Sequence, residues 1–416
     1  MKGILLSGHF WHDAWTFFFI FIIAVGVVLS QGLVIAFGVM GLAAGLTSLA
    51  WNKLSLEEVH YTREIPQHRV FIGEEVPVRV TLTNRKPVPL AWIRVEDELP
   101  SALQVVEGDV ETNVHPNIQT IRHSTSMAWY ERIRWDYRLK CTRRGLFKLG
   151  PTHLESGDPF GFLQSRKFEP SVDSLLVYPR VVPLQELGIP AAKPLGDARG
   201  GVRIIQDPSR PSGLRDYQRG DPLKIVDWKA TARSQSLQVR TFEPSTSVNI
   251  ILVVAIDTTE PYWASYEPEV LERVITAAAS AAAYSAERQY TMGLFTNDMP
   301  VSDDRPMAVR PSRGREQLSL ILGALATTRV IALEPMASRL ARHSRRFPAG
   351  STLVVSTAFV PPELVVALND LKHRGHVIVV LYVGEGHCPE MTEGILVHEI
   401  RDYFVGLEAS DETHAA

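Results

Sequence analysis

The longest hydrophobic pattern lies near the start of the chain, where residues 17–51 contain no charged side chain. One helix of that length would measure about 50 Å, far beyond the roughly 30 Å hydrocarbon core of a bilayer. A Ser-Gln-Gly sequence at residues 30–32 is the most turn-prone point of the run. The pattern therefore predicts a transmembrane hairpin within residues 1–53, with spans at about 14–29 and 33–50. A cleaved signal peptide is the alternative, but its apolar region is usually much shorter.

The charged residues near the hairpin and the cysteines of the chain predict its orientation in the membrane. The basic residues near its two ends are Lys2 on one side and Lys53 and Arg63 on the other, and the connecting turn has none. Because basic residues favour the cytoplasmic side, both ends and everything that follows are expected in the cytoplasm. Cys141 and Cys388 are too few and too far apart for a disulfide framework, which suits a reducing compartment.

The pattern then changes to short alternating stretches. Residues 76–83 and 126–141 alternate apolar and polar side chains and are bounded by turn residues. Short strands at this spacing predict a β-sandwich-like domain of immunoglobulin type over residues 55–186. Charged residues at alternate positions, such as Arg134 and Asp136, are expected on its solvated face.

A Pro- and Gly-rich stretch, residues 187–213, has the composition of a linker. Beyond it, residues 249–256 (NIILVVAI) form a continuous apolar run, as expected for a strand buried on both faces. Residues 267–289 follow with a helical period. Strand and helix patterns alternate from there onward, which predicts an α/β doubly wound domain within residues 214–408 and a tail at 409–416.

The segment before that first strand, residues 213–233, combines charged and aromatic side chains. With this order of parts, the chain resembles the bacterial membrane proteins of domain of unknown function family fifty-eight. The family signature is matched at Arg215, Tyr217, Gly220, Asp221, Asp227, Trp228, Lys229 and Arg233. Pro222 and Lys224 depart from it, and residues 144–164 are similar to a second family stretch.

The resemblance implies the nature of the C-terminal domain and a setting for the chain. It implies a von Willebrand factor A-like domain and a multi-pass protein of the bacterial inner membrane, with its soluble domains cytoplasmic. The partners that it implies are a MoxR-type AAA+ ATPase and a transglutaminase-like membrane protein, in envelope-related assembly or maturation. The expected function is therefore that of a membrane-anchored, non-enzymatic interaction or scaffold protein.

Von Willebrand A domains often bind Mg²⁺ through an Asp-x-Ser-x-Ser loop, with a Thr and an Asp from later loops. Asp257, Thr259 and either Thr327 or Thr328 match part of this pattern, but Pro261 has no ligand atom and the late Asp is missing. Two interpretations follow. The loop is a weak Mg²⁺ site of adhesion type, or Asp257 caps a helix or binds the loop backbone.

No motif in the sequence predicts catalysis. The net charge of −3 argues against a nucleic-acid binder, and phosphate-binding and nucleophile-elbow motifs are absent. Asp221 and Asp227 have no neighbouring His with which to do acid–base chemistry. We expect the charges of the signature to neutralise one another where the linker docks on the α/β domain, with Trp228 as an apolar anchor, or to form a partner-binding surface. A metal-dependent enzyme centred on Asp257 is the alternative.

Overall fold

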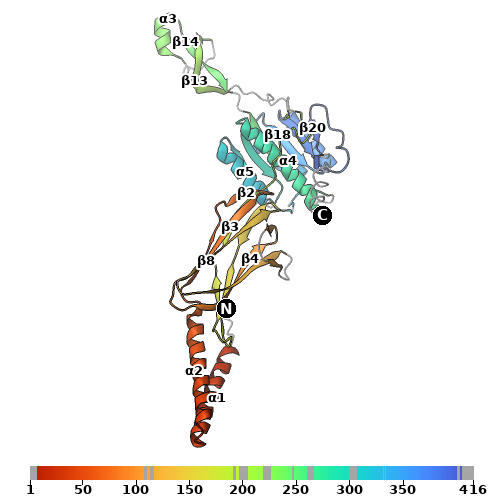
Figure 1. Cartoon of the computed structure of the whole chain (residues 1–416). Coiled ribbons are helices and arrows are strands. Elements are labelled where there is room, and N and C mark those ends of the chain that lie inside the picture. The colour runs from red at the N-terminus through yellow and green to blue at the C-terminus, as the bar shows by residue number, and fades with distance from the viewer. Residues whose placement is uncertain are drawn as a thin grey trace. The chain divides into compact units, whose positions relative to one another are not determined.

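The computed structural model forms two compact units, Met1–Val177 and Tyr178–Ala416 (Figure 1). The structure describes residues 7–106, 110–112, 117–190, 194–195, 205–218, 226–245, 248–259, 267–298, 307–330, 332, 334–400 and 403–404. The boundary between the units falls at the end of a strand, before the end of the β-rich domain predicted at residue 186.

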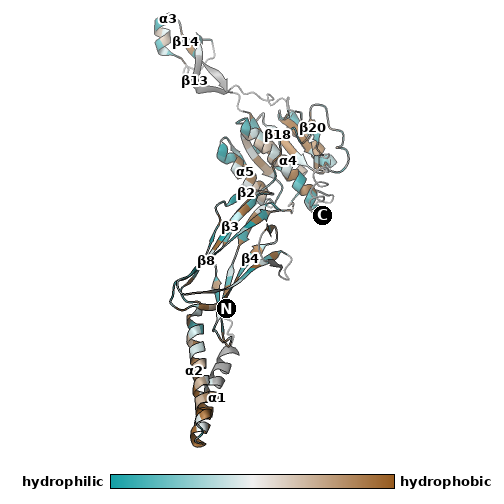
Figure 2. Cartoon of the chain, in the orientation of Figure 1, coloured by the Kyte–Doolittle hydropathy of each residue, from teal (hydrophilic) through white to brown (hydrophobic). Residues whose placement is uncertain are grey.

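Two apolar helices begin the first unit: α1 (Ser7–Val28) and α2 (Gly32–Ser55). They pack closely, because a Cβ atom at Gly41 would overlap the Phe19 ring. Helix α2 is long and apolar enough to cross a membrane, whereas the apolar part of α1, Thr16–Val28, is shorter. Figure 2 shows hydrophobic residues gathered where the two helices are joined. One helix of spanning length is therefore present near the N-terminus, and the second span stays a prediction.

The rest of the first unit consists of strands in three sheets. The four-stranded sheet has the order β1 (Val59–Glu64), β3 (Glu75–Asn84), β8 (Arg132–Cys141), β5 (Leu103–Val105). The five-stranded sheet has the order β11 (Gln164–Glu169), β10 (Thr152–Gly157), β4 (Leu90–Pro100), β7 (Ile118–Met127), β6 (Val110–Thr112). The three-stranded sheet has the order β2 (Arg69–Phe71), β12 (Asp173–Tyr178), β9 (Gly145–Leu149).

The alternating pattern predicted for these strands is confirmed by their burial. In β3 the residues Val76, Val78 and Val80 are buried and their neighbours are exposed or half-buried, while Arg134 and Asp136 of β8 face the solvent. The described pairs of the two larger sheets are antiparallel. One hydrophobic core takes residues from both of these sheets, so that each sheet buries one face against the other.

The second unit contains a six-stranded sheet with helices, as the alternation of patterns predicted. The sheet has the order β17 (Val309–Ser312), β16 (Thr291–Thr296), β15 (Asn249–Val254), β18 (Thr352–Thr357), β19 (Val377–Tyr382), β20 (Leu396–Glu399). Its helices are α4 (Pro268–Glu287), α5 (Arg315–Thr327), α6 (Met336–His343) with the 3₁₀ turn η2 (Ser344–Arg346), and α7 (Pro362–His373). All described strand pairs are parallel except β16–β17.

Helices cover both faces of this sheet. Ile251 and Val253 of β15 share a core with α6 and α7, while Ile250 and Leu252, on the opposite face, are also fully buried. Helix α4 contacts β15 and β18, and its own buried residues are mainly alanine and valine. A strand buried on both faces explains the uninterrupted apolar run in the sequence.

The predicted linker is wrong at its C-terminal end. Residues 205–213 form most of strand β13 (Ile205–Asp216), which pairs antiparallel with β14 (Gln238–Ser245), and the short helix α3 (Trp228–Ser234) lies between them in sequence. Proline is tolerated here because a two-stranded ribbon leaves one edge of each strand unpaired. The register shifts at Pro211, where the ladder is irregular.

Candidate functional site

The candidate site lies at the carboxyl ends of the parallel strands, where open α/β sheets bind ligands. Asp257 follows β15 and is 8% exposed, and Asn297 follows β16 and is fully buried. Because β15 and β16 are neighbours in the sheet, their side chains meet at this edge. The Asn297 Nδ2 atom donates to Asp257 Oδ1 at 2.8 Å.

The orientation of the Asn297 amide is determined by its other contacts. Its Oδ1 accepts the backbone N–H of Ile256 at 2.9 Å, so its NH₂ group must face Asp257. The same NH₂ group donates to the carbonyl oxygen of Glu334 at 3.0 Å, just before α6. The backbone N–H of Met336, the first residue of α6, also bonds Asp257. The carboxylate therefore joins the ends of two strands to the start of a helix.

Burial and hydrogen bonding act in opposite directions on the Asp257 carboxyl group. Burial raises the pKa of Asp257, and the opposing hydrogen bonds come from the Asn297 amide and from backbone N–H groups. Burial also raises the pKa of the adjacent Asp298, against the attraction of Arg339 and Arg329. Asp257 and Asp298, which follow the neighbouring strands β15 and β16, thus both have raised pKa values, a perturbation that is common at functional sites.

The other residues predicted for a metal site do not complete one. Thr328 ends α5 and its hydroxyl donates to the carbonyl of Ala324 at 2.9 Å, and Thr259 is half-buried in the loop after β15. Within the described ranges, no three His, Cys, Asp or Glu side chains group together as metal ligands. A hard divalent ion needs oxygen ligands, but Asn297 presents an N–H donor to Asp257. Among the described residues this edge therefore shows no complete set of Mg²⁺ ligands, and the weak site stays a prediction.

One buried hydroxyl at the same end of the sheet has no hydrogen-bond partner. Ser356 is fully buried near the end of β18 and its Oγ atom bonds no other described group. Ser356 pairs with Val254 of β15, so these two side chains share one face of the sheet. Asp257 lies an odd number of residues after Val254, which places it on the face of Val253. The hydroxyl thus belongs to the sheet face opposite that of the carboxylate, and it does not join the Asp257 cluster.

The signature segment forms a separate arrangement around α3. Asp227 is the N-cap of this helix, and its Oδ1 accepts the backbone N–H groups of Lys229 and Ala230, each at 3.0 Å. Its Oδ2 pairs with Arg240 of β14 at 2.9 Å. The Ala230 N–H bond and the Arg240 guanidinium hold the pKa of Asp227 below its usual value.

The structure differs in two respects from the charge network that we expected among the signature residues. The ionic partner of Asp227 is Arg240, outside the signature, because Asp227 lies beside β14 and its own N–H bonds Gln238 O. Trp228 is 65% exposed and is not a buried anchor, since a seven-residue helix packed on a two-stranded ribbon offers no core to bury it.

The remaining signature residues lie around this helix and its ribbon. Arg215 on β13 bonds the Asp216 carbonyl, and the N–H of Tyr217 bonds Leu237 O at 2.8 Å. Lys229 and Arg233 are exposed on α3. Gly220 and Asp221 lie outside the described residues.

Sequence reasoning missed a buried ionic cluster in the first unit. The Arg63 side chain is completely buried and bonds the carboxylates of Asp97 and Asp173 as well as the carbonyl of Leu149. Burial lowers the pKa of Arg63, but the charge and hydrogen bond of Asp97, together with the nearby Tyr61 and Tyr137, outweigh burial, so that the pKa is raised. One signal was available: in β4 Asp97 occupies the same alternating position as the core residue Val95.

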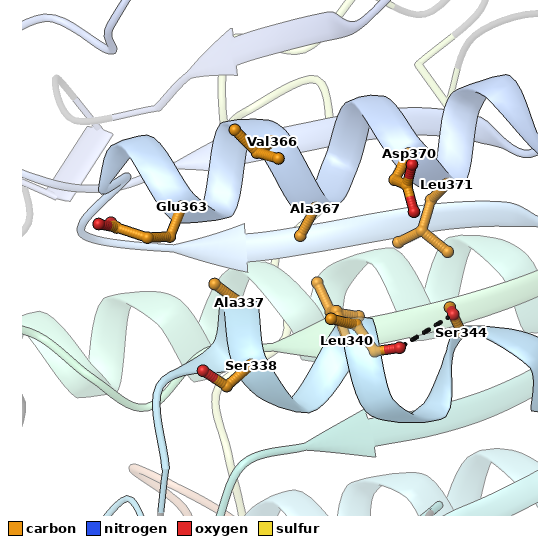
Figure 3. Close-up of a pocket in the computed structure, with 10 residues that line it drawn as sticks. Ala337, Ser338, Leu340, Ser344, Glu363, Val366, Ala367, Asp370 and Leu371 are labelled. Atoms are coloured by element: carbon orange, nitrogen blue, oxygen red, sulfur yellow. Dashed lines mark hydrogen bonds between the residues drawn. The ribbon is translucent and has the colours of Figure 1, made fainter.

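The pocket between α6 and α7 offers little chemistry. It has a volume of about 250 Å³, below the usual range for ligand sites, and small side chains such as Ala337 and Ala367 line it (Figure 3). Ser344 Oγ donates to the Ala341 carbonyl, and Asp370 pairs with Arg374 at 2.9 Å. The side chains of Ser344 and Asp370 are therefore already bonded within the protein.

The family match among the comparisons with known proteins lies in the second unit. A family model described as "Protein of unknown function DUF58" matches residues 213–389. The chain is 27% identical over 225 residues to the uncharacterized protein YeaD of Bacillus subtilis (strain 168), a match that covers 51% of this chain and 50% of that protein. The chain therefore spans about half the length of the curated relative that it matches.

Among solved structures, the chain is similar to two small domains. The CARDB domain of a Pyrococcus furiosus protein is 8% identical, with a TM-score of 0.20, and the match covers 29% of this chain and 91% of that domain. A cohesin module of a family 33 glycoside hydrolase from Clostridium perfringens ATCC13124 is 10% identical, with a TM-score of 0.20, over 29% of this chain and 96% of the module. These likenesses are too distant to bear on function.

Proposed function

Because residues 213–389 belong to the DUF58 family of proteins of unknown function, we propose that this chain is a membrane-anchored protein that binds other proteins and catalyses no reaction. One observation carries the proposal: the signature residues that the structure describes on α3 face the solvent. Trp228 is 65% exposed, and Lys229 and Arg233 are exposed beside it. Exposed Trp and Arg side chains are the residues that most often dominate protein–protein interfaces.

The same segment supports a partner of definite chemistry. Asp227 caps α3 and pairs with Arg240, so that the large solvent-facing side chains of the helix are an indole and two cations, on Trp228, Lys229 and Arg233. Such a surface suits an acidic patch on the partner. We propose the MoxR-type AAA+ ATPase as this partner and a transglutaminase-like membrane protein as a further member of the assembly, acting in envelope-related assembly or maturation.

Membrane anchoring is the second part of the proposal. Helix α2 is long and apolar enough to span a bilayer. We propose that α1 and α2 form a multi-pass anchor in the bacterial inner membrane, with the β-rich and α/β units in the cytoplasm. The close approach of Phe19 to Gly41 supports a packed helix pair, since small residues let membrane helices approach each other.

The α/β unit is proposed to be von Willebrand A-like without the metal site. A mostly parallel sheet covered on both faces by helices supports the likeness, as does Asp257 directly after the first parallel strand. The contact between Asn297 and Asp257 weighs against the alternative, a Mg²⁺-dependent binder or enzyme. In this proposal the Asp257 cluster stabilises the sheet edge, and the signature segment binds the partner.

The test is recovery of partners from native membranes with the full chain. Wild type is expected to recover the ATPase, and Trp228→Ala is expected to lose most of it. Leu320→Ala is the matched control, because Leu320 is an exposed apolar residue (58%) on α5. If wild type recovers no ATPase, or if both variants lose it equally, the proposed role of the signature segment is wrong.

A further inference from the structure

One end of the β-rich part of the first unit carries exposed aromatic side chains in two turns. Trp129 and Tyr130, in the β7–β8 turn, are each 66% exposed. Phe160 and Phe162, in the β10–β11 turn, are 54% and 62% exposed. Large aromatic rings usually bury most of their surface, so four exposed rings on one end of a domain indicate an apolar partner. We name these four residues the aromatic rim.

Strand registers place both turns at the same end of the sheet. Strand β4 begins at Leu90, which pairs with Met127 at the end of β7. Three residues further along β4, Ile93 pairs with Ser156 near the end of β10. The chain leaves β7 and β10 at the end where β4 begins, and the rim residues lie in the turns that follow.

This is also the end at which helix α2 joins the β-rich part. Lys86, in the turn before β4, donates its Nζ to the carbonyl oxygens of Ser55 and Glu57, each at 2.7 Å. Ser165, just after the β10–β11 turn, donates to the backbone and side-chain oxygens of Asn52 in α2, at 3.2 and 3.0 Å. The β7–β8 turn bonds Lys86 in turn, because the Tyr130 N–H donates to the Lys86 carbonyl at 3.3 Å. The β10–β11 turn is thus tied to the C-terminal end of the apolar helix through Ser165, and the β7–β8 turn is tied to it through Lys86.

The contacts along β11 show which way the β10–β11 turn points. Lys167 bonds the carbonyl of Val59, which follows α2, whereas Ser165 bonds Asn52 within α2. Strand residues advance about 3.3 Å each, so the turn that carries Phe162 continues from Ser165 in the direction that leads from Val59 back to Asn52 of α2. The exposed rings are thus directed toward the side from which the apolar helix comes.

Both turns are held rigidly. The Asp158 carboxylate accepts the backbone N–H groups of Phe160 and Leu163, and the Phe160 and Phe162 rings stack at 5.8 Å. In the other turn, the Glu131 carboxylate accepts the Ala128 N–H at 2.6 Å. Rigid, preformed turns lose little conformational entropy when they bind, which suits a surface built for contact.

We propose that the aromatic rim rests in the interfacial layer of the bilayer that α2 crosses, so that the β-rich part sits directly on the membrane. The inference rests on the membrane anchoring in the proposed function. Trp, Tyr and Phe favour this layer because one part of the ring is apolar and the layer is partly wet. Lipid is the occupant that the structure favours, because the rim is continuous with the end of α2 through Ser165 and Lys86.

The experiment uses the full chain in vesicles of phosphatidylcholine with brominated acyl chains, which quench a nearby fluorophore. The background variant is Cys388→Ala, since Cys141 is buried and burial raises the pKa of its thiol to about 11. An environment-sensitive fluorophore is attached after Phe162→Cys. The matched control is Phe168→Cys, an exposed ring (56%) at the far end of β11, and Leu46→Cys in α2 is the positive control.

The expected result is a loss of emission at positions 162 and 46 in brominated vesicles and none at position 168. Quenching at 46 alone overturns the inference but leaves membrane anchoring intact. A blue shift at 162 without quenching also overturns it, because the rim would then contact protein. No quenching at any position removes the membrane part of the proposed function, and this inference with it.

Discussion

The two units each bury a carboxylate and surround it differently. In the first unit, Asp97 pairs with the buried Arg63 guanidinium and accepts hydrogen bonds from Tyr61 (3.0 Å) and Thr152 (3.0 Å). In the second unit, Asp257 accepts hydrogen bonds from the Asn297 amide and from backbone N–H groups. The first unit thus surrounds its buried carboxylate with a positively charged group, whereas the second unit surrounds its buried carboxylate with uncharged N–H donors.

This difference separates a structural ion pair from a site whose charge can change. The Arg63 guanidinium compensates the buried Asp97 charge, and because it also pairs with Asp173 it connects β1, β4 and β12. Asp257 lacks that compensation, and burial raises its pKa. A change in the protonation of Asp257 therefore changes the stability of the α/β unit. In the β-rich unit, the Arg63 ion pairs join three strands.

The largest expected effect comes from breaking the ion pair. Arg63→Met leaves Asp97 buried without its counterion and should lower the free energy of unfolding of the first unit by about 3–5 kcal/mol. Hydrogen–deuterium exchange of β3 and β8 peptides at increasing urea concentration measures this for the unit by itself. The double variant Arg63→Met, Asp97→Asn should recover part of the loss, because no uncompensated charge remains.

The matched control is an exposed pair on the same sheet. Arg79 and Asp136 lie 2.8 Å apart and are both mainly exposed to solvent. Water already solvates these charges, so Arg79→Met should leave the exchange of the same peptides unchanged. Equal effects of Arg63→Met and Arg79→Met would show that burial does not distinguish the two pairs.

A smaller loss of stability is expected when the Asn297 network at the edge of the α/β sheet is removed. Asn297→Ala removes the donor to Asp257 and to Glu334 O, and the acceptor for the Ile256 N–H. Buried groups without partners cost about 1–3 kcal/mol, so we expect the second unit to lose about 2–3 kcal/mol. Exchange in β15 and β16 peptides is the measurement, and unchanged protection there would contradict the assigned network.

The pH dependence of stability sharpens the contrast between the two carboxylates. Between the ordinary aspartate pKa of 3.8 and its raised value, folded Asp257 keeps a proton that the unfolded chain has released. The free energy of unfolding therefore falls as pH rises through this window. Asp257→Asn removes that dependence, so the urea midpoint of the variant relative to wild type should increase with pH and then level off. A constant difference would show that the pKa of Asp257 is not raised.

Much of the fold follows from local pattern. The apolar run of β15 and the helical period of α4 are each contained in a short stretch, so the sequence predicts both elements and the alternation that joins them. Strand β13 was missed because its proline-rich composition indicates a linker. Its partner β14 begins 22 residues after β13 ends, and that pairing is not visible in a local window.

The residue pairs of the candidate sites were also hard to predict, because their partners lie far apart in the sequence. Asp257 was found because it follows a recognisable strand, but its partner Asn297 is 40 residues away and is brought close only by the parallel pairing of β15 and β16. The pairing of Arg63 with Asp173 spans 110 residues. The family signature pointed to Asp227, but its partner Arg240 lies on a strand that the sequence did not predict.

The smallest effect on stability is expected at Asp227, a surface carboxylate, in contrast to the buried Asp97 and Asp257. Asp227→Ala removes the N-cap of α3 and the pair with Arg240, so exchange should become faster in residues 228–234 and stay unchanged in β15 and β18. Recovery of the partner should fall less than with Trp228→Ala, because the binding side chains remain and only their helix frays. Arg240→Ala is the control that keeps the cap but removes the ion pair. If Asp227→Ala abolishes recovery while exchange in α3 is unchanged, the carboxylate itself contacts the partner, and its role as a cap is secondary.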